Sequence, residues 1–324
     1  MNLNPHNGIL ITGACGMVGS HLIDFYYQKN EVVVGTFFRP TILFDEMVGK
    51  CQLVNLDVRN KDGMMALIAE MRPQTIFHLA AQSYPTVSWS QPIETFDANV
   101  NGTIHLFEAI RAVRAENPDY DPMVVVACSS AEYGASLKPE NVPISEQAEL
   151  LPLHPYGVSK VAQDLLAYQY WAGFGIRSIR ARIFNTTGPR KQNDAAGDFT
   201  KRAIEIEKGL NNRLRVGNLS GERAITDVRD MAHALRLLAE KGKPGEAYNI
   251  CGEMAYPMSA IVDIIQREVK VPFEIWQDPA LMRPTDEAII WGDNSKLKAD
   301  TGWTQTYSLE QTITDMLNYW RANL

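Results

Sequence analysis

The sequence predicts an α/β protein built on a doubly wound parallel sheet, with a second, smaller α/β lobe that holds the substrate. Two observations lead to this prediction. Short, almost wholly apolar runs alternate with helical patterns over the first 184 residues, and a glycine-rich turn follows the first run. Such alternation indicates a parallel sheet, and unbroken apolar runs are typical of strands buried on both faces. The 324 residues suffice for one large unit and a smaller lobe.

The apolar runs and helical patterns divide the chain into elements. From apolar and β-branched residues, strands are expected at 8–12, 31–36, 52–55, 75–79, 123–127, 178–184, 247–250 and 273–276. From apolar residues three and four positions apart, helices are expected at 18–28, 61–70, 92–116, 156–171, 228–240, 260–269 and 309–320. The segment 185–212 is polar and interrupts the alternation. We therefore expect a sheet domain and a smaller lobe, made respectively of residues 1–184 plus 228–252 and of residues 185–227 plus 253–324.

The composition argues against several classes of partner. The net charge is −7, which gives no support for binding to nucleic acid or to a membrane surface. The four cysteines are scattered without metal-ligand spacing, so we expect free thiols and no metal site. The sequence shows neither a signal peptide nor an apolar run long enough to cross a membrane. These features favour a cytoplasmic protein.

A glycine-rich turn follows the first predicted strand and opens the first predicted helix. Its residues, Thr12-Gly13-Ala14-Cys15-Gly16-Met17-Val18-Gly19, have the spacing TGxxGxxG. Glycines there let the backbone approach a pyrophosphate closely, and the helix N-terminus attracts its negative charge. The strand before the turn and the helix after it make this a dinucleotide-binding pattern, which predicts a Rossmann domain. The expected cofactor contacts in this turn are Gly13, Gly16, Met17, Val18 and Gly19.

The residues after the second and third strands bear on the choice of cofactor. An acid at the end of the second strand would accept hydrogen bonds from the adenosine ribose and favour NAD. The chain has Thr36-Phe37-Phe38-Arg39 there, without an acid. Arg39 can pair with the extra phosphate of NADP, so NADP(H) is favoured and NAD(H) is the alternative. Asp57 and Val58, after the third strand, are expected to face the adenine ring.

Tyr156 and Lys160 form a YxxxK motif at the start of a predicted helix. Residues four apart share a helix face, so the ammonium is expected to lower the pKa of the phenol. Tyr156 can then exchange a proton with a sugar or alcohol oxygen, while Lys160 holds the nicotinamide ribose. Ser129 ends the fifth strand, where a hydroxyl points into the crevice that binds ligands. We expect Ser129, Tyr156 and Lys160 to be catalytic.

Together these motifs resemble the extended short-chain dehydrogenase/reductase family, whose members act on nucleotide sugars. The resemblance covers essentially the whole chain and includes His78-Leu79-Ala80-Ala81-Gln82-Ser83, Ala98-Asn99-Val100-Asn101-Gly102-Thr103 and Arg182-Ile183-Phe184-Asn185-Thr186-Thr187-Gly188-Pro189. It implies further cofactor contacts at Leu79, Ala80, Ala81, Gln82, Asn99 and Phe184. It also implies substrate contacts at Ser83, Ser130, Asn185 and Arg190.

The smaller lobe resembles the GDP-sugar branch of that family. Val216 and Asn218 lie in the segment that holds guanine in that branch, and Arg223 and Arg283 match the arginines that clamp the diphosphate. Arginine suits this task because its planar guanidinium pairs with phosphate through two hydrogen bonds. Asp286 is expected to hold the nucleoside ribose. The resemblance therefore implies a GDP-sugar held across the two lobes.

Two activities of this branch fit the pattern, and one position separates them. GDP-mannose 4,6-dehydratases carry an acid two residues after the catalytic Ser or Thr, whereas this chain has Ala131. A reductase needs only hydride from NAD(P)H, a proton from Tyr156 and a hydroxyl such as Ser129. We therefore expect reduction of the C4 keto group of a GDP-4-keto-6-deoxy-hexose, of the type that turns GDP-4-keto-6-deoxy-mannose into GDP-rhamnose. The alternative is a dehydratase or epimerase with tightly bound cofactor, in which Glu132 rotates into the pocket as the base.

Two departures from the family pattern bear on which sugar is bound. Thr86 stands where a lysine is common, and Arg223 is followed by Ala224 where the family has Asp.

A third hypothesis is a non-catalytic module that senses the cofactor, but such proteins usually lose the Tyr or the Lys of the YxxxK motif. The helices 92–116 and 156–171 have apolar faces. In the family that this chain resembles, these helices often pack against their copies in a four-helix interface, so the resemblance implies a homodimer.

Overall fold

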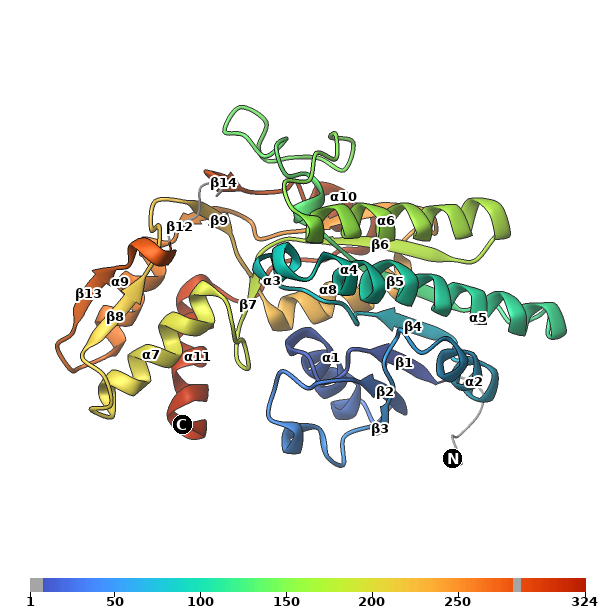
Figure 1. Ribbon diagram of the computed structural model, residues 1–324, viewed down its shortest axis with the longest axis horizontal. Coiled ribbons are helices and arrows are strands. Elements are labelled where there is room, and N and C mark those ends of the chain that lie inside the picture. The colour runs from blue at the N-terminus through green and yellow to red at the C-terminus, as the bar shows by residue number, and fades with distance from the viewer. Residues whose placement is uncertain (1–7, 282–286) are drawn as a thin grey trace.

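A parallel sheet forms the centre of the molecule (Figure 1). The computed structural model describes residues 8–281 and 287–324. The strands of the sheet run in the order β11-β6-β5-β4-β1-β2-β3, which confirms the predicted doubly wound fold. The order reverses between β1 and β4, and folds of this kind bind ligands at the carboxyl ends of the strands near that point. The strands are β1 (Ile9–Thr12), β2 (Val33–Phe37), β3 (Gln52–Asn55), β4 (Thr75–His78), β5 (Met123–Ser129), β6 (Ser178–Ile183) and β11 (Ala247–Ile250).

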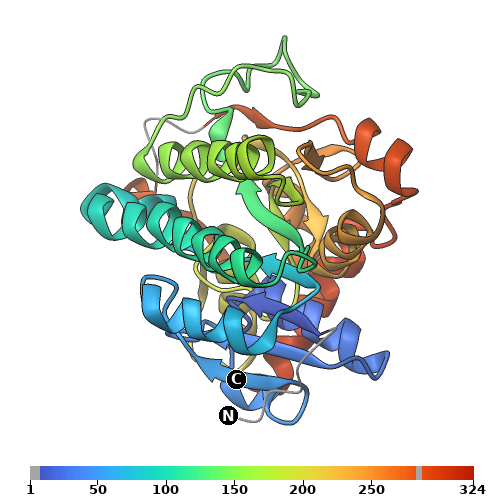
Figure 2. The same ribbon diagram turned by 90° about the vertical axis from the view of Figure 1, so that its right-hand side faces the viewer.

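Alternate residues of the strands belong to two cores, one on each face of the sheet. Ile9 and Ile11 of β1 pack with α1 and α8, whereas Leu10 packs on the opposite side with α2 and α5. Burial on both faces explains why the strands are unbroken apolar runs. Figure 2 shows α5 and α6 lying next to each other on their face. The helices on the two faces are α1 (Met17–Gln28) and α8 (Val228–Lys241), and α2 (Lys61–Met71), α5 (Gly102–Glu116) and α6 (Pro155–Phe174).

The predicted helix 92–116 contains a π-helical turn. α4 (Pro92–Phe96) passes through this turn, η2 (Asp97–Asn101), into α5 without a break. Wider turns of this kind occur often at functional sites. Asn99 lies in the turn, fully buried, and is hydrogen-bonded to the chain beyond β4. The short helix α3 (Pro85–Ser90) precedes α4.

The smaller lobe has an apolar core of its own, formed mainly by three helices and the strand β8, which pairs with the exposed strand β13. The sequence prediction missed α7 because the segment around it is polar overall and only one helix face is buried. Phe199, Ala203 and Ile206 lie on that face, and the Asp194 side chain caps the helix by accepting a hydrogen bond from Gly197 N at 2.8 Å. The elements are α7 (Ala195–Glu207), α9 (Ser259–Glu268), α11 (Leu309–Asn323), β8 (Arg213–Val216) and β13 (Glu274–Gln277).

Short elements complete the described chain. β7 pairs with β10, and β9 pairs with both β12 and β14. None of the helices within residues 8–281 and 287–324 has the length and apolar character needed to cross a membrane. The short elements are β7 (Thr186–Thr187), β9 (Glu222–Ala224), β10 (Thr226–Asp227), β12 (Ala255–Pro257), β14 (Ile289–Ile290), η1 (Phe44–Met47), η3 (Ser130–Glu132) and η4 (Pro279–Leu281).

One segment assigned by prediction to the smaller lobe packs against the sheet domain instead. α10 (Ser295–Thr301) contacts α8 and β11, and Leu297 and Trp303 lie in the core of the sheet domain. Trp303 is fully buried, and its Nε1 donates a hydrogen bond of 3.0 Å to the Asp230 carbonyl oxygen. The segment is short, and no apolar strand marks the point where the chain returns to the sheet domain. The sequence pattern therefore did not reveal that α10 packs there.

Trp303→Ala should lower the free energy of unfolding by about 3–5 kcal/mol, because it leaves a cavity in the core of the sheet domain. Urea unfolding followed by circular dichroism measures the loss. The matched control is Trp89→Ala, since Trp89 is 62 % exposed and should change stability by about 0.5 kcal/mol at most. Equal losses in the two variants would contradict the position of Trp303.

Candidate active site

The glycine-rich turn lies between the end of β1 and the start of α1. Gly13 has a φ of 72°, and a Cβ there would come within 2.9 Å of the Ala80 main-chain nitrogen. A Cβ on Gly19 would clash with the Gly13 carbonyl oxygen, so both positions need glycine. Gly16 is the N-cap of α1 without a side-chain cap, and the first turn of the helix holds no acid. These uncapped N–H groups fit a pyrophosphate. The turn contains the predicted contacts Gly13, Gly16, Met17, Val18 and Gly19.

Two arginines lie close to one aromatic ring beyond the ends of β2 and β3. Arg39 has a φ of 51°, and its guanidinium lies 5.0 Å from the centre of the Phe38 ring. Arg59 lies 5.6 Å from the centre of the same ring. Neighbouring parallel strands end at the same edge of the sheet, so both cations stand where such folds bind the adenosine part of a dinucleotide. The prediction missed Arg59, although a cation just after the strand next to β2 was a usable signal.

The Asp57 carboxylate is hydrogen-bonded to Arg59, and its expected contact with adenine stays a prediction. The carboxylate accepts hydrogen bonds from Arg59 at 2.6 and 3.1 Å. Burial opposes the charge on Asp57, but the hydrogen bonds and the charge of Arg59 outweigh it and lower the pKa of the carboxyl. The Val58 side chain is buried in the core and has little surface to offer a cofactor. The structure thus makes Asp57 a support for the arginine beside Phe38.

Main-chain and side-chain hydrogen bonds hold the segment after β4 against the glycine-rich turn. Leu79 N and Ala80 N donate to Thr12 Oγ1 at 3.1 and 3.2 Å. Gln82 N donates to Asn99 Oδ1 at 2.8 Å, and Asn99 Nδ2 donates to Gln82 O at 3.1 Å. The same Nδ2 donates to a serine hydroxyl of α6. The fully buried Asn99 therefore positions this edge through protein groups, in place of the predicted direct contact with the cofactor.

Ser129, Tyr156 and Lys160 come together where β5 ends and α6 begins. His154 caps α6 by accepting a hydrogen bond of 3.0 Å from Gly157 N, which sets the start of the helix. The first two turns carry the tyrosine and the lysine, and Lys160 Nζ lies 5.8 Å from the centre of the Tyr156 ring. Ser129 ends β5 and is hydrogen-bonded to Tyr156. The three predicted catalytic residues are thus neighbours.

The surroundings of Tyr156 keep its phenol protonated. Burial raises the pKa of Tyr156 to about 12, against the opposing effect of its hydrogen bond with Ser129. Burial also lowers the pKa of Lys160 to about 8. The ammonium donates to Ala127 O at 2.8 Å and to Gln163 Oε1 at 2.7 Å. The predicted lowering of the Tyr156 pKa is therefore wrong, and a protonated phenol is suited to donate a proton.

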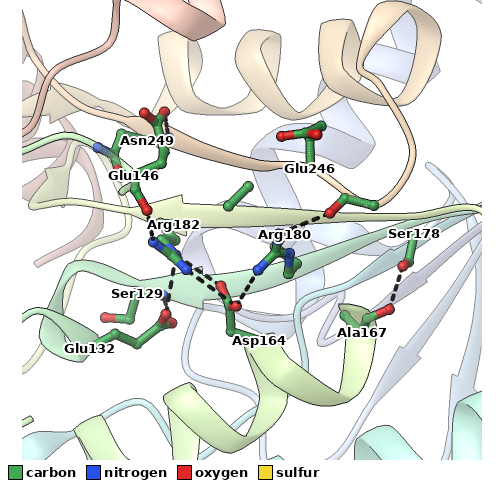
Figure 3. Close-up of polar contacts among 12 residues, drawn as sticks. Ser129, Glu132, Glu146, Asp164, Ala167, Ser178, Arg180, Arg182, Glu246 and Asn249 are labelled. Carbon is green, nitrogen blue, oxygen red and sulfur yellow. Dashed lines mark hydrogen bonds and ion pairs between the residues drawn. The ribbon is translucent and has the colours of Figure 1, made fainter. Parts of the chain in front are cut away.

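Glu132 is turned into the protein. It is fully buried, and its Oε1 accepts a hydrogen bond of 2.7 Å from Ser129 N (Figure 3). Its Oε2 lies 3.4 Å from Arg182 Nε, which also pairs with Asp164 at 2.9 Å. Burial and the charge of Asp164 raise the pKa of Glu132 well above its usual value, against the opposing effect of Arg182. This placement does not agree with the alternative in which Glu132 reaches the substrate as a base; it fixes the end of β5.

Three groups of the metal-ligand type gather in the same place. Cys128 Sγ and carboxylate oxygens of Glu132 and Asp164 lie within 4.8 Å of one another. The guanidinium of Arg182 already lies against both carboxylates, so a metal cation there would meet a positive charge. The arrangement is that of an ion-pair network.

Further predicted contacts lie near the ends of β4, β5 and β6. Phe184 is buried, with its ring centre 6.0 Å from that of Tyr133 in a small apolar cluster. Ser130 is also buried, whereas Asn185 and Ser83 are exposed. Asn185 and Ser83 are therefore accessible to a substrate, and Phe184 and Ser130 offer little surface.

Arg190 links the two lobes through ion pairs, and its expected contact with the substrate stays a prediction. Its guanidinium pairs with Asp24 of α1 at 2.7 Å and with Glu46 of η1. Glu46 also accepts a hydrogen bond of 2.7 Å from Tyr319 Oη on α11. The segment between β2 and β3 is thereby anchored to the smaller lobe.

The residues of the smaller lobe that were predicted to contact guanine and phosphate differ in their exposure to solvent. Val216 is fully buried, and its carbonyl oxygen accepts a hydrogen bond of 2.9 Å from Asp278 N. Neither the side chain nor the carbonyl oxygen of Val216 is therefore open to guanine. Asn218 follows β8, and its Oδ1 accepts a main-chain hydrogen bond two residues further on. Arg223 lies half-buried on β9. Two predicted residues lie outside the described part of the chain: Arg283 and Asp286.

Comparisons with known proteins agree with this architecture. A family model described as GDP-mannose 4,6 dehydratase matches residues 10–316. GDP-6-deoxy-D-mannose reductase of Pseudomonas aeruginosa is 27 % identical over 98 % of this chain and 98 % of its own length. GDP-mannose 4,6-dehydratase of Vibrio cholerae is 24 % identical over 95 % of this chain and 92 % of its own length. The solved structure of RMD from Pseudomonas aeruginosa complexed with NADPH has a TM-score of 0.83 and 25 % sequence identity, covering 98 % of this chain and 100 % of that chain.

The parallel sheet, the glycine-rich turn and the group Ser129, Tyr156 and Lys160 define an NAD(P)-dependent enzyme of the extended short-chain dehydrogenase/reductase class. Because the family model spans nearly the whole chain, the protein belongs to the family described as GDP-mannose 4,6 dehydratase. Similar proteins carry the names of reductases, dehydratases and epimerases, so membership of the family does not by itself decide the reaction.

Glu132→Gln should remove one pH-dependent contribution to stability. The folded state holds the Glu132 proton to a higher pH than the unfolded state, whose glutamate pKa is about 4.3. The contribution is fully present below about pH 4.3 and is lost as the pH rises through the folded pKa, by up to about 1.4 kcal/mol per pH unit. The stability of wild type minus that of the variant should therefore decrease with rising pH in urea unfolding. A difference that increases with pH would contradict this protonation state.

The same variant separates a structural role from a catalytic one. An amide keeps an oxygen for Ser129 N but cannot act as a base. Loss of a general base typically costs about 10²–10⁴-fold in rate. We expect Glu132→Gln to change turnover by less than about ten-fold, whereas Tyr156→Phe, which removes the proton donor, should show the full loss.

Proposed function

We propose that the protein reduces the C4 keto group of a GDP-4-keto-6-deoxy-hexose with NADPH, with GDP-4-keto-6-deoxy-mannose as substrate and GDP-rhamnose as the type of product. The observation that carries the proposal is the position two residues after Ser129, where Ala131 takes the place of an acid. The neighbouring acid, Glu132, is buried against Arg182. A dehydratase must remove a proton from a sugar carbon and needs a base there, whereas a reductase does not.

Reduction needs a hydride, a proton and groups that stabilise the oxygen as it becomes negative. When bound, the nicotinamide supplies the hydride to the C4 carbon. Tyr156, protonated at neutral pH, gives its Oη proton to the carbonyl oxygen, and the Ser129 hydroxyl donates a second hydrogen bond to that oxygen. The nearby Lys160 ammonium then favours the phenolate that remains. Solvent returns the proton to Tyr156 after the alcohol leaves.

The nucleotide is proposed to be GDP. Both curated relatives described above are named for GDP-linked mannose derivatives, and they match nearly the whole chain. Arg223 on β9 is the described residue proposed for the diphosphate, and Asn218 is proposed for the guanine. Asn185 and Ser83, both exposed near the ends of the central strands, are proposed to contact the sugar. The contacts of Arg283 with the diphosphate and of Asp286 with the nucleoside ribose stay predictions.

The preferred cofactor is proposed to be NADP(H). The end of β2 carries no acid that would accept from the adenosine ribose, and two cations, Arg39 and Arg59, lie 5.0 and 5.6 Å from the centre of the Phe38 ring. A 2′-phosphate would be paired by guanidinium groups in that position. One solved relative, at 25 % identity, is described as complexed with NADPH.

A cytoplasmic homodimer is proposed as the working form. Free cysteines are typical of a reducing compartment, and the four in this chain form no disulfide. Large apolar side chains lie exposed along α6, which lies beside α5, and a second copy would cover them. They are Val158, Leu165, Tyr168 and Phe174.

Oxidation of NADPH in the presence of GDP-4-keto-6-deoxy-mannose tests the reaction. The absorbance of the reduced nicotinamide should fall in proportion to the substrate added, and Tyr156→Phe should slow the fall by about 10²–10⁴-fold. The same sugar linked to dTDP is the control for the nucleotide and should react poorly. Conversion of GDP-mannose to its 4-keto-6-deoxy derivative, without net consumption of cofactor, would instead identify a dehydratase.

Arg39→Ala should weaken binding of NADPH by about ten-fold or more and leave NADH nearly unchanged, because a hydrogen bond to a charged group contributes about 1.5–3 kcal/mol. Fluorescence of the bound reduced nicotinamide measures both dissociation constants. The control is Arg213→Ala, since Arg213 is an exposed arginine of β8 in the other lobe. Equal weakening of the two cofactors in Arg39→Ala would exclude a specific role in binding the phosphate.

A further inference from the structure

The buried ammonium of Lys160 depends on very few partners. The residue is 3 % exposed, so its charge has little access to water. Nζ donates to the main-chain oxygen of Ala127 at 2.8 Å and to the side-chain oxygen of Gln163 at 2.7 Å. Among the residues that the structure describes, Gln163 is the one side chain recorded as accepting from this ammonium. Gln163 is itself fully buried, one helical turn after Lys160.

The orientation of the Gln163 amide is dictated by its second partner, Thr103. The Thr103 hydroxyl donates to the Asn99 carbonyl oxygen at 2.6 Å, and a carbonyl oxygen can only accept. Thr103 Oγ1 can therefore only accept from Gln163 Nε2, which lies 2.9 Å away. The amide nitrogen must face Thr103, so the amide oxygen must face Lys160. This polarity leaves the glutamine no alternative orientation with both bonds made.

The same threonine extends the network to the glycine-rich turn. His78 Nε2 lies 3.1 Å from Thr103 Oγ1. Because the Thr103 hydroxyl hydrogen is already engaged in the hydrogen bond to the Asn99 carbonyl oxygen, His78 Nε2 must be the donor and carry the ring proton. His78 Nδ1 then accepts from Thr12 Oγ1 at 2.9 Å. His78 is fully buried, and burial lowers its pKa to about 3, so the ring stays neutral. Thr12 Oγ1 in turn accepts hydrogen bonds from Leu79 N and Ala80 N, which follow β4.

We propose that Gln163 is a positioning residue of the active site: through its amide oxygen it holds the Lys160 ammonium in place and in its charged form, and Thr103 and His78 lock that amide in the required orientation. The proposal rests on the proposed function, in which Lys160 acts beside Tyr156. It assigns Gln163 no contact with substrate or cofactor. Its effect on the reaction passes through Lys160.

The charge state of Lys160 is sensitive to this one bond. The titratable groups that face it are His78 on β4, Cys128 on β5, Glu132 on η3 and Tyr156 on α6. Burial holds His78 neutral, raises the pKa of Cys128 well above its usual value, and with the charge of Asp164 raises that of Glu132. Cys128 and Glu132 oppose the lowering of the Lys160 pKa, but burial outweighs them. With the lysine pKa near 8, the loss of one acceptor shifts the ammonium toward its neutral form.

Titration of Lys160 by NMR tests the proposal without any activity measurement. The protein is labelled with ¹³C at the ε-carbon of lysine, and the Lys160 signal is identified by its disappearance in Lys160→Arg. Gln163→Leu should lower the pKa of Lys160 by about one pH unit, because a charge-assisted hydrogen bond is lost. Gln163→Glu, of the same shape, should raise that pKa by about one pH unit or more, because a carboxylate replaces the amide.

The matched control is Gln169→Leu, the same substitution at an exposed position of the same helix, which should leave the Lys160 titration unchanged. If Gln163→Leu does not fold, the Gln163→Glu titration decides. A Lys160 pKa that stays within about 0.3 pH units of wild type in the folded Gln163 variants overturns the proposal.

Kinetics distinguish this proposal from the proposed function. With keto-sugar and NADPH, the alkaline limb of kcat/KM should move down in Gln163→Leu and up in Gln163→Glu, in step with the NMR titrations. A limb that does not move while the NMR titration does would overturn the statement that Gln163 acts on the reaction through Lys160. If wild type reduces no keto-sugar, the proposed function fails, and the NMR titration still decides whether Gln163 holds Lys160.

Discussion

The arrangement of the reaction centre depends on one buried positive charge, the guanidinium of Arg182 on β6 (Figure 3). Its side chain is 5 % exposed and is bonded to Asp164 of α6 at 2.9 Å, to Tyr133 Oη at 3.0 Å and to the Glu146 carbonyl oxygen at 3.0 Å. A charge in the interior must be neutralised and hydrogen-bonded, and removing one partner of such a pair typically costs about 3–5 kcal/mol. The helix that carries Tyr156 and the loop that follows β5 are thereby held to the same strand.

Two acidic side chains lie against this guanidinium, and their pKa values shift in opposite directions. Asp164, also paired with Arg180 at 2.8 Å, keeps a lowered pKa in spite of its burial, whereas the pKa of Glu132 is raised. Glu132 accepts a hydrogen bond from Ser129 N and fixes the end of β5. The raised pKa disfavours a negative charge on Glu132 beside Ser129, whose hydroxyl is proposed to stabilise the keto oxygen as negative charge develops there during reduction. The ion-pair network and the proposed reaction are therefore compatible.

The sequence predicted the parts of the molecule that depend on local patterns. The parallel sheet follows from unbroken apolar runs, and the glycine-rich turn, Tyr156, Lys160 and Ser129 follow from spacing along single elements. Roles that depend on which distant residues meet could not be predicted in this way. Arg190 was expected from the resemblance to contact the substrate, and its ion pairs with Asp24 and Glu46, which lie more than a hundred residues away, could not be predicted from the sequence. The raised pKa of Tyr156 likewise comes from burial, which no four-residue spacing reveals.

The central claim is that a keto-sugar receives hydride from the cofactor and keeps it. It is tested most directly by supplying NADPH deuterated at the transferable position of nicotinamide C4 together with GDP-4-keto-6-deoxy-mannose, and by locating the deuterium by mass spectrometry and NMR. The account predicts one deuterium at C4 of the sugar for each NADPH oxidised. An unlabelled product, or turnover of GDP-mannose in which the deuterium stays with the cofactor pool and no NADPH is consumed, would contradict it.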